Sequence, residues 1–171
     1  MKSVLISIKP KYCELIASGK KTVEVRKTKP KLETPFKCYI YCTKDEMVYL
    51  PKDIFGDEAL NGKVIGEFVC DRISGGSGEY AVYHTGGTCL TPTEIADYIG
   101  DKYAYFWHIS DLVIYDKPRE LGEFYVWKKC NSCRDTGYES TACCYDEDCK
   151  VPAVITRPPQ SWCYVESKDT K

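Results

Sequence analysis

The residues most able to do chemistry lie close together near the start of the chain. Lys21, Glu24 and Arg26 follow Gly19 in the segment GKKTVEVR. In a strand, residues two apart lie on one face about 7 Å from each other, so Glu24 and Arg26 can act at one site. Lys21 lies at the bend before the strand, from which its side chain can reach the same face. Together a carboxylate, a permanent cation and an amine can bind a phosphate or a nucleobase edge, and can relay a proton.

Spacing alone allows two interpretations of this cluster. In the first, Lys21 and Glu24 are the candidate catalytic pair, and Arg26 clamps an anion. In the second, Glu24 and Arg26 form a surface ion pair beside a solvated lysine. If the cluster is a binding site, we expect Ser7 and Lys9, just upstream, to lie on its rim.

A second candidate binding segment lies near the end of the chain, in the sequence RPPQSW. Arg157 and Gln160 supply hydrogen-bond donors, and the indole of Trp162 can stack on a base. We therefore expect these three residues to bind ligand. The alternative is that Trp162 packs inside the last strand.

The elements that must position these residues are short. Residues 3–8 and 22–26 have the pattern of strands, and further strands are expected at residues 36–42, 62–73, 107–115 and 162–165. Pro10 and Gly19 bound a short helix. Thr91, Pro92 and Glu94 form a capping box that predicts a second helix, ending at Gly100. This order predicts a mainly β, α+β fold, namely a closed or partly open antiparallel β-barrel with two or more short helices, or else an open α+β sandwich.

Composition limits the classes of protein that fit. The chain has 171 residues, which suits a single domain over 1–171. It lacks an apolar run long enough for a membrane span or a secretory signal, so we expect a cytoplasmic protein without membrane partners. The net charge is −1, yet residues 1–31 carry nine basic and two acidic side chains. Their charge of +7 suggests an anionic partner such as RNA or a nucleotide, although a solvated lysine-rich face is the simpler alternative.

A cysteine-rich insertion is expected at residues 130–150. Residues 130–149 contain five of the 11 cysteines and no Leu, Ile, Val, Phe, Met or Trp, so apolar burial cannot hold this segment. Four thiolates suffice for a structural zinc ion, and the candidate ligands are Cys130, Cys133, Cys144 and Cys149, with Cys143 as an alternative to its neighbour. A reduced-thiol loop and a redox pair are the other interpretations. No organic cofactor is expected.

Several motifs together resemble the ASCH domain, a relative of the PUA superfamily, in its small bacterial and phage members. They are VLISIKP at 4–10, the G-x-K-x-x-E-x-R pattern at 19–26, GKVIGE at 62–67, WHISDL at 107–112, YDKP at 115–118 and TRPPQSWCYV at 156–165. The resemblance implies a PUA-like barrel, a cleft lined by the signature residues, and a role connected with RNA or modified nucleosides.

The resemblance also suggests two activities. One branch of the family removes the acetyl group of N4-acetylcytidine with a lysine, a threonine nucleophile and a glutamate. Lys21 matches the lysine, but Glu24 occupies the threonine position. Other members are ribonucleases, for which Lys21, Glu24 and Arg26 are plausible acid, base and phosphate-binding groups.

We therefore expect a protein that binds RNA or a modified nucleobase in a cleft lined by Lys21, Glu24 and Arg26. The first alternative is a hydrolase, either an amidohydrolase of the N4-acetylcytidine type or a ribonuclease, that uses Lys21 and Glu24. The second is a non-catalytic adaptor that binds another protein.

Overall fold

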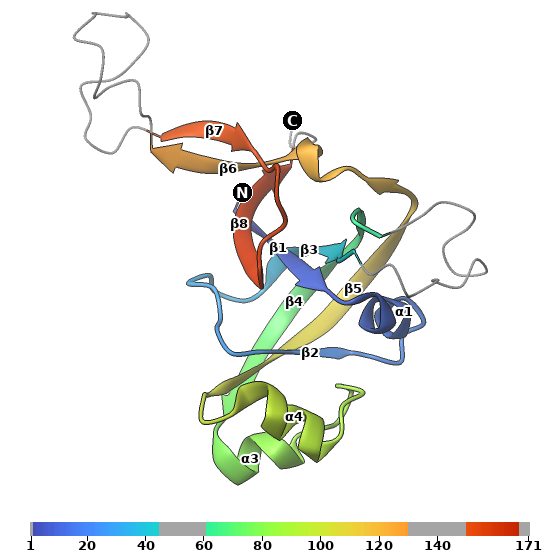
Figure 1. The fold of residues 1–171 in the computed structure, drawn as a ribbon, viewed down its shortest axis with the longest axis vertical. Helices are drawn as coiled ribbons and strands as arrows, with labels where there is room; N and C mark the ends of the chain where they lie inside the picture. The colour runs from blue at the N-terminus through green and yellow to red at the C-terminus, as the bar shows by residue number, and fades with distance from the viewer. Residues whose placement is uncertain (1, 45–60, 130–149, 168–171) are drawn as a thin grey trace, which may run out of the picture.

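The described part of this computed structural model, residues 2–44, 61–129 and 150–167, consists of eight strands and a few short helices (Figure 1). The strands are β1 (Ser3–Ile8), β2 (Val23–Arg26), β3 (Phe36–Cys42), β4 (Val64–Gly76), β5 (Ala104–Arg119), β6 (Phe124–Lys129), β7 (Lys150–Val154) and β8 (Trp162–Ser167). The helices are α1 (Pro10–Ala17), α3 (Gly78–Tyr83), α4 (Pro92–Ile99) and the 3-10 turn η1 (Leu121–Glu123). None of the described helices is long and apolar enough to cross a membrane.

The strands form one mixed sheet in the order β2-β5-β4-β3-β1-β8-β6-β7. β1 and β3 are parallel, and the other neighbouring strands are antiparallel. A parallel pair needs a long crossover connection, which α1 and β2 supply here. β2 and β7 lie at opposite ends of the strand order, so the sheet is open within the described residues. The mainly β, α+β class is confirmed. The expected closed or partly open antiparallel barrel is not confirmed as closed, and its sheet includes one parallel pair, β1 and β3.

The side chains of β1 alternate between two apolar clusters, so this strand is buried on both faces. Val4, Ile6 and Ile8 belong to the core cluster that also contains Cys13 and Ile16 of α1. Leu5 points the other way, into a cluster with Phe124 of β6 and Val165 of β8. The strand therefore joins two apolar layers, and the residue that follows it, Lys9, emerges at the surface.

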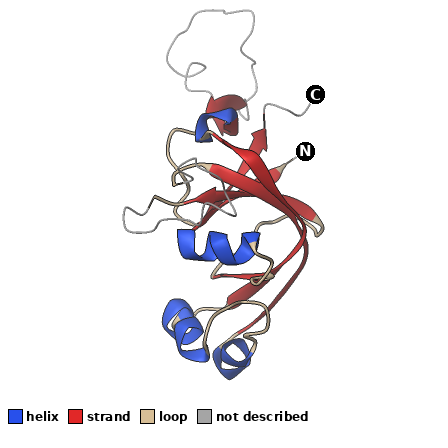
Figure 2. Ribbon diagram, turned by 90° about the vertical axis from the view of Figure 1, so that its right-hand side faces the viewer, coloured by secondary structure: helices blue, strands red, loops and turns tan. Residues whose placement is uncertain are grey.

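A third apolar cluster attaches α3 and α4 to β2. Val23 and Val25 pack with Ala81 of α3 and with Ile95 and Ile99 of α4. Figures 1 and 2 show these two helices together beyond β2, with α1 on the other side of that strand. Because the valines face α3 and α4, the alternating residues Glu24 and Arg26 must face the opposite side of the strand.

The expected elements are confirmed in most of the chain. Both helices and all six strands expected from the sequence are present, and the capping box of Thr91 and Glu94 closes as expected. α3 and the β6–β7 hairpin were not predicted from the sequence. The cysteine-rich segment and its four candidate zinc ligands, Cys130, Cys133, Cys144 and Cys149, lie between these two strands and outside the described residues.

Candidate functional site

A turn after α1 sets the orientation of β2. Gly19 has a φ of 72°, in the left-handed region that glycine adopts at low cost. The Lys21 N–H then donates to Leu15 O at 2.8 Å, and the Thr22 N–H donates to Gly87 O at 2.8 Å. These bonds fix the chain on both sides of the bend, so Lys21 enters the fold from the same side as Glu24.

Lys21, Glu24 and Arg26 are brought together, and they are buried. Their exposed fractions are 2%, 7% and 9%. Lys21 Nζ lies 3.3 Å from Glu24 Oε2, and Arg26 Nη2 lies 3.3 Å from Glu24 Oε1. One carboxylate therefore lies between two cations, and the local net charge of the three groups is +1. Burial removes most of the solvent screening that weakens surface ion pairs.

Backbone carbonyls hold the ammonium group of Lys21. Nζ donates to Thr88 O at 2.6 Å and to Val23 O at 2.9 Å, and it lies 5.2 Å from the centre of the Tyr12 ring. These acceptors suit a charged ammonium. They also fix its position, because two of its three protons are already directed at oxygens.

Arg26 connects β2 to the end of β1. Its Nη2 donates to Ser7 O at 2.5 Å, in addition to its contact with Glu24. Its Nε–H has no hydrogen-bond partner, although the guanidinium is buried. The group is therefore anchored at one end and retains an unused donor at the other.

Buried side-chain polar atoms without hydrogen bonds gather at this one place, and one of them, Glu24 Oε2, forms the ion pair with Lys21. In the described part of the chain they are Glu24 Oε2, Arg26 Nε and Trp107 Nε1. Trp107 of β5 lies directly opposite Glu24 of β2 in the strand register, so all three atoms belong to neighbouring side chains on one face. Buried polar groups in native proteins are nearly always hydrogen-bonded. Two of the three atoms, those of Glu24 and Arg26, belong to side chains that line a cavity, and this arrangement suits a polar ligand.

The cavity beside these groups has a volume of about 320 Å³. It lies among β2, the end of β1, α1 and α4. Its lining residues are Ser7, Ile8, Lys9, Tyr12, Lys21, Glu24, Val25, Arg26, Leu90, Glu94, Asp97 and Tyr98. Three of these side chains are basic and three are acidic, so the lining as a whole is electrically balanced. Two tyrosines and three aliphatic residues make the rest of the wall largely apolar.

Ser7 and Lys9 line the cavity, as expected for rim residues. The Ser7 hydroxyl donates to Pro159 O at 2.6 Å, and the Ser7 N–H donates to Ser161 O at 2.9 Å. These two bonds hold the C-terminal segment against the end of β1. Lys9 is exposed and keeps its ammonium available to a ligand.

The predicted ligand-binding residues Arg157, Gln160 and Trp162 are not in the cavity lining. Arg157 and Gln160 are exposed on the segment that follows β7. Trp162 is half-buried in β8, where its ring centre lies 6.0 Å from that of Trp107 and its Nε1 donates to Thr28 Oγ1 at 3.0 Å. Trp162 thus packs in the last strand, as the alternative interpretation had it. The ligand contacts of these three residues stay a prediction.

Tyr12 and Tyr98 line the cavity, and the sequence analysis did not identify them as site residues. The sequence held a weak signal, since a tyrosine on an apolar helix face brings a polar hydroxyl that must be satisfied. Their proximity to Glu24, however, depends on how α1 and α4 flank β2.

The threonines near the site do not replace the nucleophile of the amidohydrolase branch. Thr22 is exposed and does not line the cavity. The Thr88 hydroxyl donates to Thr85 O at 2.7 Å and accepts from the Leu90 N–H at 3.2 Å. Among the described residues, no group of three or more His, Cys, Asp or Glu side chains could hold a metal ion.

Comparison with known proteins agrees with the fold and identifies the family. The family model of the ASCH domain matches residues 6–95, which include the end of β1, all of α1 and β2, and most of the cavity lining. The chain belongs to the ASCH domain family. This family is associated with RNA binding. A search of curated proteins found no match.

Solved ASCH structures from Zymomonas mobilis are similar to this chain. The crystal structure of ASCH from that organism is 26% identical over 70% of this chain and 73% of its own, with a TM-score of 0.54. A tyrosine-to-phenylalanine mutant of the same protein is 25% identical over 71% of this chain and 77% of its own, with a TM-score of 0.55. A serine-to-alanine mutant superimposes over 96% of this chain and 88% of its own at 21% identity, with a TM-score of 0.61, and shows the fold alone.

Proposed function

We propose that this protein binds RNA by holding one nucleobase, plain or modified, in the cavity beside Lys21, Glu24 and Arg26. The observation that carries this proposal is a pair of polar atoms on two side chains that line the cavity. Arg26 Nε has no hydrogen-bond partner, and Glu24 Oε2 forms the 3.3 Å ion pair with Lys21 but accepts no hydrogen bond. A base edge offers complementary donors and acceptors in one plane. It can therefore satisfy both atoms at once.

The charge balance of the cavity favours a base over a phosphate as the buried group. Glu24 already neutralises part of the charge of Lys21 and Arg26, and Glu94 and Asp97 add two further acidic side chains to the lining. A phosphate would place its negative charge near all three carboxylates. A neutral ring with an amino donor beside an acceptor, as in cytosine or adenine, meets no such repulsion.

Apolar contacts complete the proposed binding site. Tyr12 and Tyr98 offer ring surfaces, and Leu90 and Val25 offer aliphatic ones. Aromatic side chains stack on bases in most proteins that recognise single-stranded RNA. Lys9, exposed at the rim, is placed to meet the phosphate of the bound nucleotide.

Calorimetric titration with CMP, AMP and ribose 5-phosphate tests this assignment. We expect one of the two nucleotides to bind more tightly than ribose 5-phosphate, because only the nucleotides carry a base. Arg26→Lys keeps the positive charge but removes the Nε donor, and Glu24→Gln removes the charged acceptor. Each change should weaken binding about tenfold or more, the usual effect of losing a hydrogen bond to a charged group.

Lys117→Ala is the matched control, because Lys117 is exposed and does not line the cavity. Circular dichroism checks that each variant is folded. Equal affinity for nucleotide and ribose 5-phosphate would contradict the proposal, as would unchanged binding by the folded Arg26→Lys protein.

Hydrolysis of a bound nucleoside or RNA is the second candidate function. The 3.3 Å separation of Lys21 Nζ and Glu24 Oε2 at the cavity wall favours it, since an acid and a base then meet at one place. Mass spectrometry after incubation with N4-acetylcytidine, and separately with single-stranded RNA, tests it. Turnover that disappears in Lys21→Met and Glu24→Gln supports catalysis, and the absence of any product leaves binding as the function.

A further inference from the structure

A second surface begins at the cavity and leads away from it. The segment that follows β2, residues 27–31, has the sequence KTKPK, and its three lysines each contribute to a contact with a tyrosine from another element. These contacts pair Lys27 with Tyr98, Lys29 with Tyr105, and Lys31 with Tyr164.

Two of these contacts are cation–π contacts, and the third is a hydrogen bond. Lys27 Nζ lies 4.8 Å from the centre of the Tyr98 ring, and Lys29 Nζ lies 5.7 Å from that of Tyr105. The Lys31 N–H donates to the Tyr164 hydroxyl at 2.6 Å, which leaves the exposed Lys31 ammonium free to point outward. Tyr98 also lines the cavity, so the row starts at the cavity mouth.

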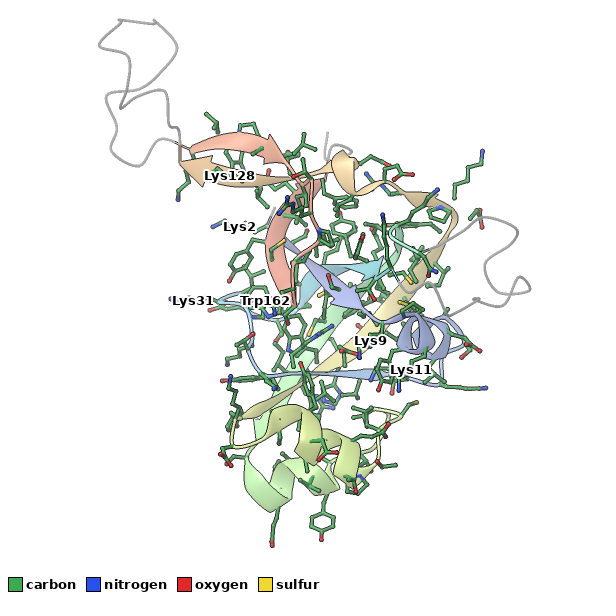
Figure 3. The ribbon with its side chains drawn as sticks, viewed as in Figure 1. Lys2, Lys9, Lys11, Lys31, Lys128 and Trp162 are labelled. Atoms are coloured by element: carbon green, nitrogen blue, oxygen red, sulfur yellow. The ribbon has the colours of Figure 1, made fainter. Side chains whose placement is uncertain are left out.

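The row continues past Tyr164 into a second cavity. Lys2 Nζ lies 5.9 Å from the centre of the Tyr164 ring. Lys2 and Tyr164 line a groove of about 370 Å³ between β8 and the β6–β7 hairpin, together with Tyr125 and Trp127. Trp127 is 47% exposed. In Figure 3, Lys31 and Lys2 lie on the same side of the molecule as Trp162 of β8.

Sequence and packing keep this row in place. The Thr28 hydroxyl accepts the indole N–H of Trp162 at 3.0 Å, and Pro30 is buried. These two contacts hold the middle of the segment against the protein, so its lysines project from a fixed backbone. Carboxylates near the row include Asp97 beside Tyr98, Glu33 just after the segment, and Glu166, which accepts a hydrogen bond from Tyr125 at 3.3 Å.

We propose that this row, from Tyr98 through Lys29 and Lys31 to Lys2 and Trp127, binds the flanking nucleotides of a single-stranded RNA. This inference rests on the proposed function, because it extends the strand from the base in the cavity. Repeated pairing of a cation with an aromatic ring suits a single strand, which offers a phosphate and an unstacked base at every step. A duplex hides its bases and fits such a row less well.

Fluorescence anisotropy with a labelled eight-nucleotide RNA, at two salt concentrations, tests the row. We expect Lys29→Glu and Lys31→Glu each to weaken binding several-fold, and the double variant to lower the salt slope by about 1.4, the loss of two phosphate contacts on a single strand. Trp127→Ala should weaken binding roughly tenfold if a base stacks there. Lys117→Glu, which replaces an exposed lysine outside the row, is the matched control. It makes the same change in net charge as each row variant, and its salt slope should stay close to that of the wild type.

The same variants titrated with CMP or AMP separate this inference from the proposed function. If the row is correct, Lys29→Glu and Lys31→Glu keep wild-type affinity for the mononucleotide while losing affinity for the oligomer. If Lys29→Glu and Lys31→Glu bind the oligomer as well as Lys117→Glu does, the row does not bind RNA, and the assignment of the cavity stands. If the oligomer depends on the row but no mononucleotide binds, the row stands and the cavity assignment is wrong.

Competition experiments identify the class of partner. Excess unlabelled single-stranded RNA should displace the probe at lower concentration than a duplex of the same length. Equal displacement by the duplex, or by polyglutamate of similar charge, would overturn the assignment to single-stranded RNA, and polyglutamate would then point to an acidic protein partner.

Discussion

The carboxylate of Glu24 lies 3.3 Å from the guanidinium of Arg26, and both side chains are buried on one face of β2. An exposed pair of this kind contributes at most about 1 kcal/mol to the free energy of unfolding. Burial changes the consequence of a substitution, because loss of one partner leaves an uncompensated charge away from water. Lys21 is the third member of this buried cluster.

Replacing Lys21 by methionine should lower the free energy of unfolding by more than about 2 kcal/mol. The substitution keeps an aliphatic chain of similar size but leaves the Thr88 and Val23 carbonyls without their donor, and Glu24 without one of its cations. Urea denaturation measures the effect. Lys20→Met at the neighbouring exposed position is the control, and equal stability of the two variants would contradict the buried role of Lys21.

Glu67 should make the stability of the protein depend on acid pH. Burial alone would raise the pKa of this carboxyl, but hydrogen bonds from Lys37 and Tyr115 outweigh it, and the net pKa is lowered from 4.5. In the unfolded chain the group therefore takes up its proton at higher pH than in the native protein. Its contribution is present above about pH 4.5 and is lost as the pH falls through the native pKa.

Urea denaturation of the wild type and of Glu67→Gln, at neutral pH and at pH values below 4.5, measures this contribution. The difference in stability between the two proteins should shrink in acid. Glu33→Gln, at an exposed position, serves as the control and should show no such change. A Glu67→Gln protein whose deficit is the same at every pH would argue against the linkage.

Thr91→Ala should loosen α4 and thereby weaken ligand binding. The Thr91 hydroxyl accepts the Glu94 N–H at 3.2 Å, and the Thr91 N–H donates to Glu94 Oε2 at 2.8 Å. Loss of such a cap costs about 1 kcal/mol. Because Asp97 and Tyr98 of this helix line the cavity, nucleotide affinity should fall together with stability.

Thr93→Ala is the matched control, since Thr93 is exposed on the same helix and outside the capping box. Calorimetry with the preferred nucleotide and thermal unfolding are compared for both proteins. If the two alanine variants behave alike, α4 does not depend on its cap.

Cys89 should react with alkylating reagents faster than the other cysteines of the described segments, by roughly tenfold or more. It is exposed, whereas burial raises the pKa of Cys70 to about 12 and that of Cys163 to about 11. Burial likewise raises the pKa of Cys13 and Cys38 well above the usual value. Time-resolved alkylation with peptide mapping follows each thiol separately, and rapid labelling of Cys38 or Cys70 in the folded protein would show that the core opens readily.

Local patterns were sufficient to predict most elements. Alternation marked β1 and β2, and the capping box of Thr91 and Glu94 marked α4, because each signal is complete within a few residues. The β6–β7 hairpin was missed because its two strands are far apart in the sequence, with residues 130–149 between them. Its pairing of Tyr125 with Val154 follows from no local pattern.

The cluster at the centre of the candidate site was also predictable from local patterns. Period two placed Glu24 and Arg26 on one face, and the turn at Gly19 brought Lys21 to them. For Trp162 the residue type allowed both ligand stacking and packing in the last strand. The structure shows its packing near Trp107, and its contact with ligand stays a prediction. The side chain of a tryptophan serves either role, and only its neighbours distinguish them.

The sequence by itself determined which groups share a strand face, since the geometry of a strand depends on neighbouring residues alone. Tertiary structure decided that this face is buried, that Tyr12 and Tyr98 enclose it, and that Trp107 lies opposite Glu24. These outcomes depend on contacts between segments distant in the chain, which form only because all apolar faces of the sheet and helices must be buried together. The chemistry of the site therefore comes from a short segment, and its surroundings come from the whole fold.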